Sequence, residues 1–180
     1  MGDKVILLDM DGVLVDFVGG AYKHHRRPMP DAVPWKIWET MGIDEKEFWE
    51  PLGYDFWAGL DWTPDGKELV HNLQAMVGVH RIALLTSPCL TPGCAEGKLA
   101  WIKRHLPQFE RQYLLGPAKQ FAAGPGKILV DDHYPNVEKF REAGGQAVLV
   151  PRPWNSLGSA LDGEASLTHT LRAVASQLLS

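Results

Sequence analysis

The stretch VILLDMDGVLVDF, residues 5–17, decides the fold. Four apolar residues run directly into Asp9, Asp11 follows two positions later, Gly12 comes next, and an apolar run then resumes. A short continuous apolar run bounded by turn residues is typical of a strand that is buried on both faces. A second such run, ILVDD at residues 128–132, also ends in paired aspartates. The sequence therefore places carboxylates at the ends of two buried strands.

Strand-like and helix-like patterns alternate along the chain. The strands that we expect are Lys4–Asp9, Arg81–Thr86, Lys127–Asp131 and Gln146–Val150, with a weaker one at Tyr113–Leu115. Helices are expected from Thr63-Pro64 onward with Leu69, Leu73, Met76 and Val77 on one face, at 95–106, at 135–143, and along a stripe of Leu167, Leu171, Val174 and Leu178. This alternation predicts an α/β fold with a Rossmann-like parallel sheet and helices on both of its faces.

One segment interrupts the alternation. Five of the seven tryptophans lie between Phe17 and Trp62, together with four prolines that prevent one long helix. We expect a small helical insertion that leaves the core after the first strand and returns at Thr63. The predicted domains are therefore an α/β core made of residues 1–16 and 63–180, and a helical insertion at 17–62.

Composition excludes several classes of partner. The net charge of −4 gives no broad basic surface, so neither an extended nucleic-acid surface nor binding to an anionic membrane is expected. The chain has no apolar run long enough for a membrane span and no signal-peptide pattern, so we expect a cytoplasmic protein. Its two cysteines, Cys89 and Cys94, are expected to be reduced thiols. A homodimer is compatible with the sequence, which does not determine the oligomeric state.

The paired aspartates indicate a metal site. In open parallel sheets ligands bind at the carboxyl ends of the strands, where Asp9, Asp11, Asp131 and Asp132 would meet and repel one another without a cation. Oxygen ligands at such an edge favour Mg²⁺. The alternatives are that each pair only forms a turn, or that Asp9 opens a calcium loop. The calcium loop fails because a strand precedes it and its twelfth position is Gly20 rather than Glu.

Further polar residues follow other predicted elements. Thr86 and Ser87 come directly after the second strand, where a hydroxyl and main-chain N–H groups can hold a phosphate oxygen. Lys119 lies in a loop and can bring a positive charge to the same edge. Alone, such residues are more often a helix cap or a solvated side chain, so it is their order along the chain that carries weight.

That order resembles the four motifs of the haloacid dehalogenase (HAD) superfamily of phosphatases: DxDG, then Thr/Ser, then Lys, then DD. Within this superfamily the chain resembles the 5'(3')-deoxyribonucleotidases. The narrower likeness rests on DMDGVLVDFVGG at 9–20, YDFW at 54–57, LLTSP at 84–88, GKLAWIKRHL at 97–106 and ILVDD at 128–132.

The resemblance implies a role for each matched residue. Asp9 would be the nucleophile that forms an aspartyl-phosphate, and Asp11 the general acid and base. Mg²⁺ would bind Asp9, the main-chain carbonyl of Asp11 and one of Asp131 and Asp132, with the family pattern favouring Asp132. Phosphate would be held by Thr86, Ser87 and Lys119. Lys98 matches a family position near the phosphate, but an ordinary lysine on a helix surface would account for it equally well. The insertion would be a substrate-selecting cap whose Phe17, Phe56 and Trp57 stack on a nucleobase.

Two places depart from the family pattern. Pro117 and Ala118 stand where family members carry Arg-Asp before the motif lysine, so one cationic contact near the substrate is absent. The tail after Val150, PRPWNSLG, matches only loosely, and contacts from Arg152 or Asn155 have no assigned place. The leading expectation is a Mg²⁺-dependent phosphatase for deoxyribonucleoside 5'(3')-monophosphates. The alternatives are the same chemistry on another small phosphomonoester or a nucleic-acid 3' phosphate, and a non-catalytic nucleotide-binding module.

Overall fold

The structure, a computed structural model, describes residues 4–158 and 163–180. Its elements in chain order are β1 Val5–Leu8, α1 Phe17–His24, α2 Ile37–Met41, α3 Glu45–Trp49, α4 Tyr54–Ala58, α5 Gly66–Val77, η1 Val79–Arg81, β2 Ile82–Thr86, α6 Cys94–His105, η2 Pro107–Phe109, β3 Tyr113–Leu115, η3 Lys119–Ala122, β4 Lys127–Asp131, α7 Tyr134–Glu142, β5 Gln146–Leu149 and α8 Gly163–Leu179.

The five strands form one parallel sheet in the order β3-β2-β1-β4-β5. β1 is the central strand, and its Leu8 pairs with Leu84 of β2 on one side and with Val130 of β4 on the other. All five expected strands are present and differ from the prediction by at most one residue at either end. Because β1, β2 and β4 are neighbours and parallel, their carboxyl ends lie side by side at one edge.

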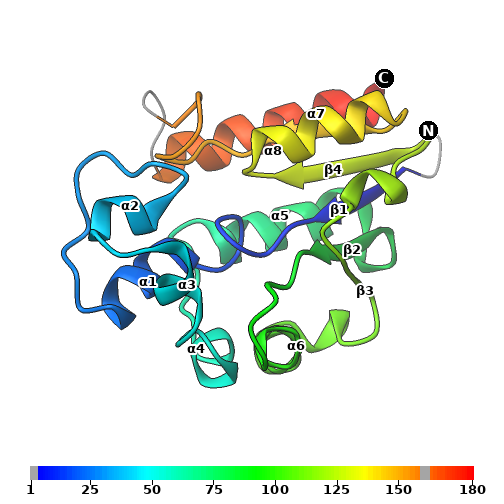
Figure 1. Cartoon of the computed structure of the whole chain (residues 1–180). Coiled ribbons are helices and arrows are strands. Elements are labelled where there is room, and N and C mark those ends of the chain that lie inside the picture. Colours follow the sequence, from blue (N-terminus) through cyan, green and yellow to red (C-terminus); the bar gives the residue numbers. More distant parts are fainter. Residues whose placement is uncertain (1–3, 159–162) are drawn as a thin grey trace.

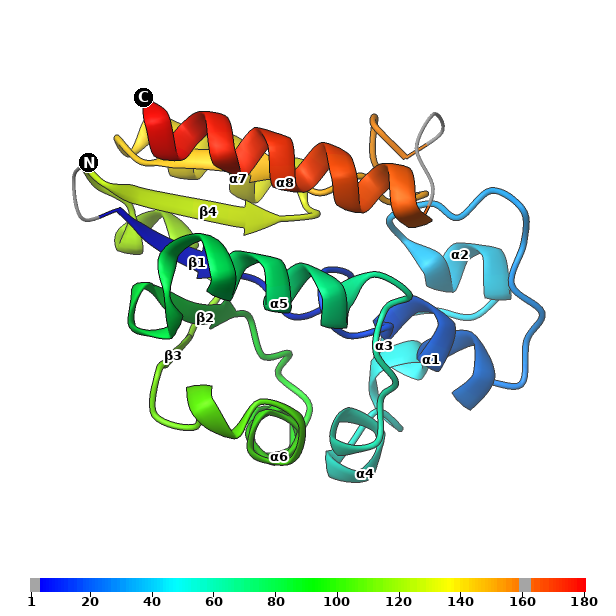
Figure 2. The same ribbon diagram turned by 180° about the vertical axis from the view of Figure 1, so that it is seen from behind.

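Helices cover both faces of the sheet, as the α/β pattern predicts. Ile6 and Leu8 of β1 belong to a core shared with α5 and α8, whereas Leu7 belongs to a second core with Val137 and Phe140 of α7. Alternate side chains of one strand thus enter opposite layers. Figures 1 and 2 show α8 and α5 together on one side of the sheet and α7 on the other.

The helix that follows the insertion differs from the prediction in two details. α5 begins at Gly66 rather than at Thr63-Pro64. The Thr63 hydroxyl does not cap the helix but donates a hydrogen bond to the carbonyl of Val13, 2.8 Å away. Met76, expected on the buried face with Val77, is 38% exposed. Position 76 lies at the margin of the apolar stripe, and the flexible thioether of Met tolerates contact with solvent.

The segment between β1 and α5 contains the short helices α1, α2, α3 and α4. In both views these helices lie beyond the arrowheads of the strands, past the carboxyl ends of β1 and β4. Phe48 and Leu52 are fully buried within the segment, and α4 packs along α6 of the α/β part. The segment is therefore helical and lies over the edge where the acidic residues converge. Its status as a separate domain stays a prediction.

Candidate active site

Three buried carboxylates meet at the carboxyl edge of the sheet. Asp9 directly follows β1, Asp131 is the last residue of β4, and Asp132 follows it. One carboxylate oxygen from each of these residues lies within 4.8 Å of the other two. All three residues are at most 6% exposed. The sequence expected four carboxylates at this edge, and the structure gathers three of them in one cluster.

Lys119 ties this acidic cluster together. Its ammonium nitrogen lies 2.7 Å from Asp9 Oδ1 and 2.6 Å from Asp131 Oδ2, and the lysine side chain is only 2% exposed. Asp131 is fixed further because its Oδ1 accepts a hydrogen bond from the main-chain N–H of His133 at 2.8 Å. The loop that carries Lys119 contains the short helix η3, which begins at this residue. A single lysine thus joins the ends of β1 and β4.

Asp11 lies in a second ion pair beside the cluster. One of its carboxylate oxygens contacts the ammonium group of Lys98, which also donates a hydrogen bond to the Thr86 hydroxyl at 3.1 Å. The other oxygen, Oδ1, is buried and has no hydrogen-bond partner among the described residues. Lys98 is 1% exposed and its ammonium group lies 4.6 Å from the centre of the Trp57 ring. It is therefore a buried site residue and not a lysine on a helix surface.

Burial raises the pKa of three carboxyl groups in the site. For Asp9 and Asp11 desolvation raises the pKa, while Lys119 and Lys98 respectively counteract part of that rise. The pKa of Asp132 is raised well above its usual range by burial, with the neighbouring charges of Asp131 and Asp9 adding to the effect. For Lys119 burial lowers the pKa, but the attraction of Asp9 and Asp131 outweighs it and the net shift is upward.

The charges of the site do not balance. Four aspartates, at positions 9, 11, 131 and 132, face two buried lysines, which leaves two negative charges when all groups are ionised. Buried unpaired charge is costly, and the raised pKa values of the carboxyls express that cost. A divalent cation with a preference for oxygen ligands would compensate both charges. The cluster of residues 9, 131 and 132 fits Mg²⁺ by ligand type, and Asp11 is expected to contribute only its main-chain carbonyl.

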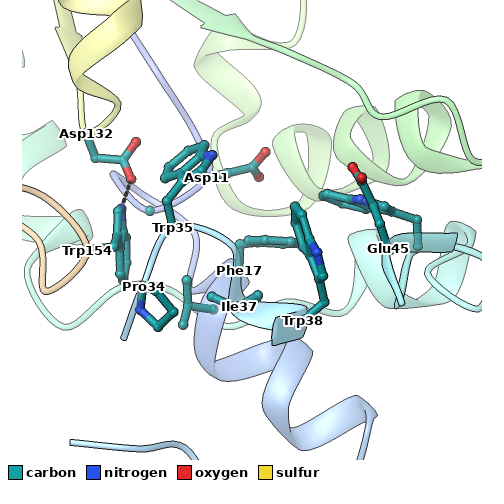
Figure 3. Close-up of a pocket in the computed structure, with 12 residues that line it drawn as sticks. Asp11, Phe17, Pro34, Trp35, Ile37, Trp38, Glu45, Asp132 and Trp154 are labelled. Carbon is teal, nitrogen blue, oxygen red and sulfur yellow. Dashed lines mark hydrogen bonds between the residues drawn. The ribbon is translucent and has the colours of Figure 1, made fainter. Parts of the chain in front are cut away.

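An aromatic pocket opens next to these residues. It has a volume of about 270 Å³ and is lined by Asp11 and Asp132 at one end and by residues of the helical segment at the other. Figure 3 shows Trp35 and Trp38 of that segment facing the pocket together with Trp154 and Phe17. The Trp35 ring stacks on the imidazole of His133, with ring centres 3.9 Å apart. The full lining is Asp11, Gly12, Phe17, Val18, Pro34, Trp35, Ile37, Trp38, Glu45, Trp49, Asp132 and Trp154.

Of the three aromatic residues expected to stack on a base, Phe17 lines this pocket, whereas Phe56 and Trp57 do not. Phe17 lies parallel to the ring of Trp57, with centres 5.3 Å apart and an angle of 4°, and it also stacks with Trp49, with centres 5.7 Å apart. No base can enter between rings that already stack on each other. Trp57 is 3% exposed, and its indole N–H donates to the carbonyl of Leu52. Phe56 lines a different hollow. These rings, of which only Phe17 reaches the pocket, form the core of the helical segment.

The carboxyl end of β2 places two further residues named in the sequence, Thr86 as its last residue and Ser87 directly after it. Thr86 is fully buried and its hydroxyl accepts the bond from Lys98, whereas Ser87 is half-buried and its hydroxyl donates to the carbonyl of Gly116 at 3.3 Å. Cys89 and Cys94 are free thiols, as expected. A hydrogen bond with Cys94 lowers the pKa of Cys89 to about 6.

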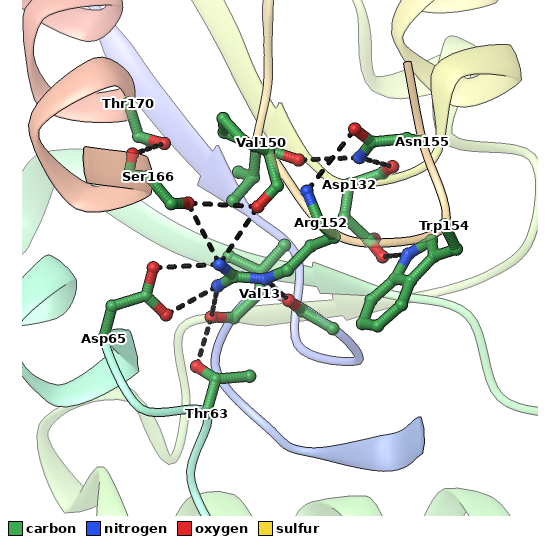
Figure 4. Close-up of polar contacts among 12 residues, drawn as sticks. Val13, Thr63, Asp65, Asp132, Val150, Arg152, Trp154, Asn155, Ser166 and Thr170 are labelled. Atoms are coloured by element: carbon green, nitrogen blue, oxygen red, sulfur yellow. Dashed lines mark hydrogen bonds and ion pairs between the residues drawn. The ribbon is translucent and has the colours of Figure 1, made fainter. Parts of the chain in front are cut away.

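The tail after Val150 supplies contacts that the sequence alone did not place (Figure 4). Arg152 is 8% exposed and forms a two-pronged ion pair with Asp65, at 2.7 and 2.9 Å, while also donating to the carbonyls of Gly12 and Val13. It therefore holds the turn that follows Asp11. The proximity of this tail to the site follows from the strand order, because β5 is the neighbour of β4 and the residues after β5 lie beside the carboxyl end of β4.

Comparison with known proteins agrees with this arrangement. The family described as "5' nucleotidase, deoxy (Pyrimidine), cytosolic type C protein" matches residues 3–159. The cytosolic-type 5'(3')-deoxyribonucleotidase of Homo sapiens is 28% identical over 142 residues, which cover 71% of this chain and 69% of the relative. The mitochondrial 5'(3')-deoxyribonucleotidase of Mus musculus is 30% identical over 145 residues, which cover 71% of this chain and 63% of the relative.

Among solved structures, a phosphonoacetaldehyde hydrolase-like protein from Oleispira antarctica is 17% identical, with a TM-score of 0.48. The alignment covers 98% of this chain and 84% of that protein, and the likeness is too distant to bear on function. The family match, by contrast, covers most of the chain and includes both aspartate pairs. The chain thus belongs to the deoxyribonucleotidase-like 5' nucleotidase family of HAD phosphatases.

Proposed function

We propose that this protein is a Mg²⁺-dependent phosphatase that hydrolyses deoxyribonucleoside 5'(3')-monophosphates through an aspartyl-phosphate. The observation that carries the proposal is the junction of the acidic cluster and Lys119 with an aromatic pocket of about 270 Å³. The first feature suits a transferring phosphoryl group, and the second suits a flat apolar group attached to it. The family match supports the same chemistry.

In the first step a carboxylate oxygen of Asp9 attacks phosphorus and the ester P–O bond breaks in line with it. Asp11 gives its proton to the leaving alkoxide. Its Oδ1 is buried without a hydrogen-bond partner among the described residues. Burial raises the pKa of Asp11 and Lys98 counteracts part of that rise, and a raised pKa favours the protonated form that a general acid needs. The products of this step are the free nucleoside and Asp9 phosphorylated on its side chain.

In the second step the Asp11 carboxylate takes a proton from a water molecule, which attacks phosphorus and breaks the bond to Asp9. Inorganic phosphate leaves, and both aspartates return to their starting states. Lys119 and Lys98 stay fixed by their ion pairs and stabilise the charge on the phosphoryl oxygens, with Thr86 and Ser87 beside them. Mg²⁺, held by Asp9, Asp132 and the main-chain carbonyl of Asp11, would neutralise the phosphate and orient it for attack.

The helical segment at 17–62 acts as the substrate-selecting cap in this proposal. Trp35, 51% exposed, and the half-buried Trp38 line the pocket opposite Asp11 and Asp132, so they replace Phe56 and Trp57 as the candidate base-stacking residues. Stacking of a base on an aromatic ring contributes about 1–3 kcal/mol. The cap would thus select a nucleotide by its base while the sheet edge binds its phosphate.

A second candidate is the same chemistry on another small phosphomonoester or a nucleic-acid 3' phosphate. The apolar lining favours an aromatic group without requiring a nucleobase. A non-catalytic nucleotide-binding module is the third candidate. It is disfavoured because all the residues that the chemistry needs are present: Asp9, Asp131 and Asp132 cluster around Lys119, and Asp11 pairs with Lys98 beside them.

The test is release of phosphate from a panel of 5' and 3' deoxyribonucleotides, ribonucleotides, a 3'-phosphorylated oligonucleotide and para-nitrophenyl phosphate, with Mg²⁺ present. We expect deoxyribonucleoside monophosphates to give the highest kcat/KM. Asp9→Asn, which removes the attacking charge, should lose several orders of magnitude of turnover while remaining folded. A variant that retains more than about a tenth of turnover would exclude Asp9 as nucleophile.

A second part of this experiment tests whether the aromatic pocket binds the base. Trp38→Ala should lower kcat/KM for the best nucleotide by about 5- to 140-fold, the range that corresponds to the stacking energy, and change para-nitrophenyl phosphate much less. Trp62→Ala is the matched control, because Trp62 lies outside the pocket lining. Equal loss on both substrates would place Trp38 outside the substrate pocket. Equal use of nucleotides and para-nitrophenyl phosphate by the wild type would favour the second candidate.

A cytoplasmic location and a homodimer both stay predictions. In the part of the chain that the structure covers, residues 4–158 and 163–180, no helix has the length and apolar character needed to cross a bilayer. The named relatives include a cytosolic type and a mitochondrial type.

A further inference from the structure

The segment Pro151–Asn155 follows β5 and brings three polar side chains to the candidate site. Arg152 holds the Gly12–Val13 turn, as described above, while Trp154 and Asn155 both contact Asp132 (Figure 4). Two of the three side chains, those of Trp154 and Asn155, therefore bear on one residue of the acidic cluster, Asp132.

Asn155 fixes the main chain of Asp132. Its side-chain amide donates to the carbonyl of Asp132 at 2.9 Å and to the carbonyl of Val150 at 2.8 Å. The oxygen of the same amide accepts a bond from the main-chain N–H of Leu157 at 3.1 Å. One side chain thus clips the residue after β4 to the residue after β5. The position from which the Asp132 side chain starts is therefore set by the tail.

Trp154 fixes the carboxylate itself. Its indole N–H donates to Asp132 Oδ2 at 2.5 Å. An indole nitrogen can only donate a hydrogen bond, so Asp132 Oδ2 must be the acceptor in this pair. The ring is held in place by Gly12, where a Cβ atom would lie 2.8 Å from its Cζ2 carbon. Asp132 is in consequence held on one oxygen by a side chain that cannot easily turn.

The same ring is a wall of the aromatic pocket. Trp154 lines the cavity together with Trp35 and Asp132, and Figure 3 shows its indole beside the Asp132 carboxylate. The N–H edge of Trp154 therefore faces Asp132, and the same ring forms part of the wall of the space where a substrate would lie. Bonds from neighbouring groups to a ligating carboxylate commonly change metal affinity by about 10- to 100-fold when they are removed.

We propose that Trp154 is a positioning residue with two separable roles: its indole N–H orients Asp132 for Mg²⁺, and its ring shapes the substrate pocket. The inference rests on the proposed function, since it takes Mg²⁺ as the ion of the acidic cluster. Trp154→Phe keeps an aromatic wall and removes only the N–H, whereas Trp154→Ala removes both.

The experiment measures Mg²⁺ binding by isothermal titration calorimetry without substrate. Trp154→Phe should raise the Kd for Mg²⁺ by about 10- to 100-fold. Trp101→Phe is the matched control, because Trp101 is fully buried and donates its N–H to the carbonyl of Leu60 at 2.8 Å. The control should leave the Kd within about twofold of the wild type, even if it lowers the melting temperature. Asn155→Ala offers an independent route to the same ligand and should also weaken binding.

Kinetics separate positioning from a folding defect. At saturating Mg²⁺ Trp154→Phe should regain near wild-type kcat with little change in nucleotide KM, whereas Trp154→Ala should keep a raised KM. Equal Mg²⁺ affinity in the wild type and Trp154→Phe overturns the positioning role and leaves the proposed function standing. A wild type that binds no Mg²⁺ overturns both. Weaker binding in Trp101→Phe of the same size as in Trp154→Phe also overturns the assignment, since the effect would then be general loosening.

Discussion

Replacing Arg152 with Met should destabilise the protein more than most single substitutions. Arg152 is buried, its guanidinium pairs with both oxygens of Asp65 at 2.7 and 2.9 Å, and it donates to Ser166 at 3.1 Å and to the carbonyl of Val13 at 3.2 Å. Met has a stem of similar length, so the packing of the aliphatic part is largely kept. The perturbation is the loss of the charge and of all the donors of the fork.

The magnitude follows from what stays behind. The Asp65 side chain is 6% exposed, so it would be left as a buried carboxylate without its cation. Removing one partner of a buried ion pair costs about 3–5 kcal/mol. For a chain of this size 1 kcal/mol corresponds to about 2–4 °C in melting temperature, which gives a decrease of about 6–20 °C. Arg152→Lys keeps the charge but not the fork and should recover only part of the loss.

Chemical denaturation and thermal melting at neutral pH measure the effect. The exposed pair Lys36–Glu39, whose side chains are both 61% exposed, supplies the control: Lys36→Met should change stability by less than about 0.5 kcal/mol. Arg152→Met combined with Asp65→Leu should be more stable than Arg152→Met alone, because no unpaired carboxylate remains. A loss below about 1 kcal/mol for Arg152→Met would refute the reasoning.

Four more outcomes are expected. Trp57→Ala should lower the free energy of unfolding by about 3–5 kcal/mol, because the ring is buried, and should lower activity on nucleotides and on para-nitrophenyl phosphate alike. A loss confined to nucleotides in steady-state kinetics would contradict the assignment of Trp57 to the core. Gly12→Ala should lower the free energy of unfolding by about 1–2 kcal/mol because of its positive φ of 73°, and by more because the new Cβ would collide with Asp132. Gly42→Ala, with a φ of 69° and open space around it, should lose only the first amount in denaturant titrations. Alkylation of Cys89 by iodoacetamide should be fast above pH 6 and slow as the pH falls through about 6, because its pKa is lowered and the thiolate persists to that point; a midpoint above 8 would show an ordinary thiol. EDTA should abolish activity reversibly and Mg²⁺ should raise the melting temperature with occupancy, and full activity in chelator would point to a metal-free reaction.

The sheet was predictable because its strands are buried on both faces. β4 has the predicted bounds, Lys127–Asp131, since a continuous apolar run between turn residues allows few other structures. The start of the helix expected at Thr63 was less certain because Thr63 bonds to Val13, a residue 50 positions earlier in the chain. Such a bond depends on the tertiary fold and leaves no local pattern.

The site was predictable where residue type and strand position coincide. Asp9 and Asp131 were expected at one sheet edge because each ends a buried strand, and Lys119 was expected there from the order of motifs that resembles the HAD phosphatases. The pocket was not predictable in detail, because which of many tryptophans face it depends on how short helices pack. Trp57 had a plausible position in the sequence and lies in the core, while Trp154 was left without a role and lies against the cluster.

The bridge that Lys119 makes between the ends of β1 and β4 affects how a metal ion would bind. Because the lysine already draws Asp9 and Asp131 to 2.7 and 2.6 Å, the two strand ends are joined before any cation arrives. Mg²⁺ would therefore enter a preassembled site and would not have to gather its ligands from a loose chain. Synthesis and folding could then proceed without regard to the supply of metal, and the catalyst could lose and regain its ion many times without unfolding.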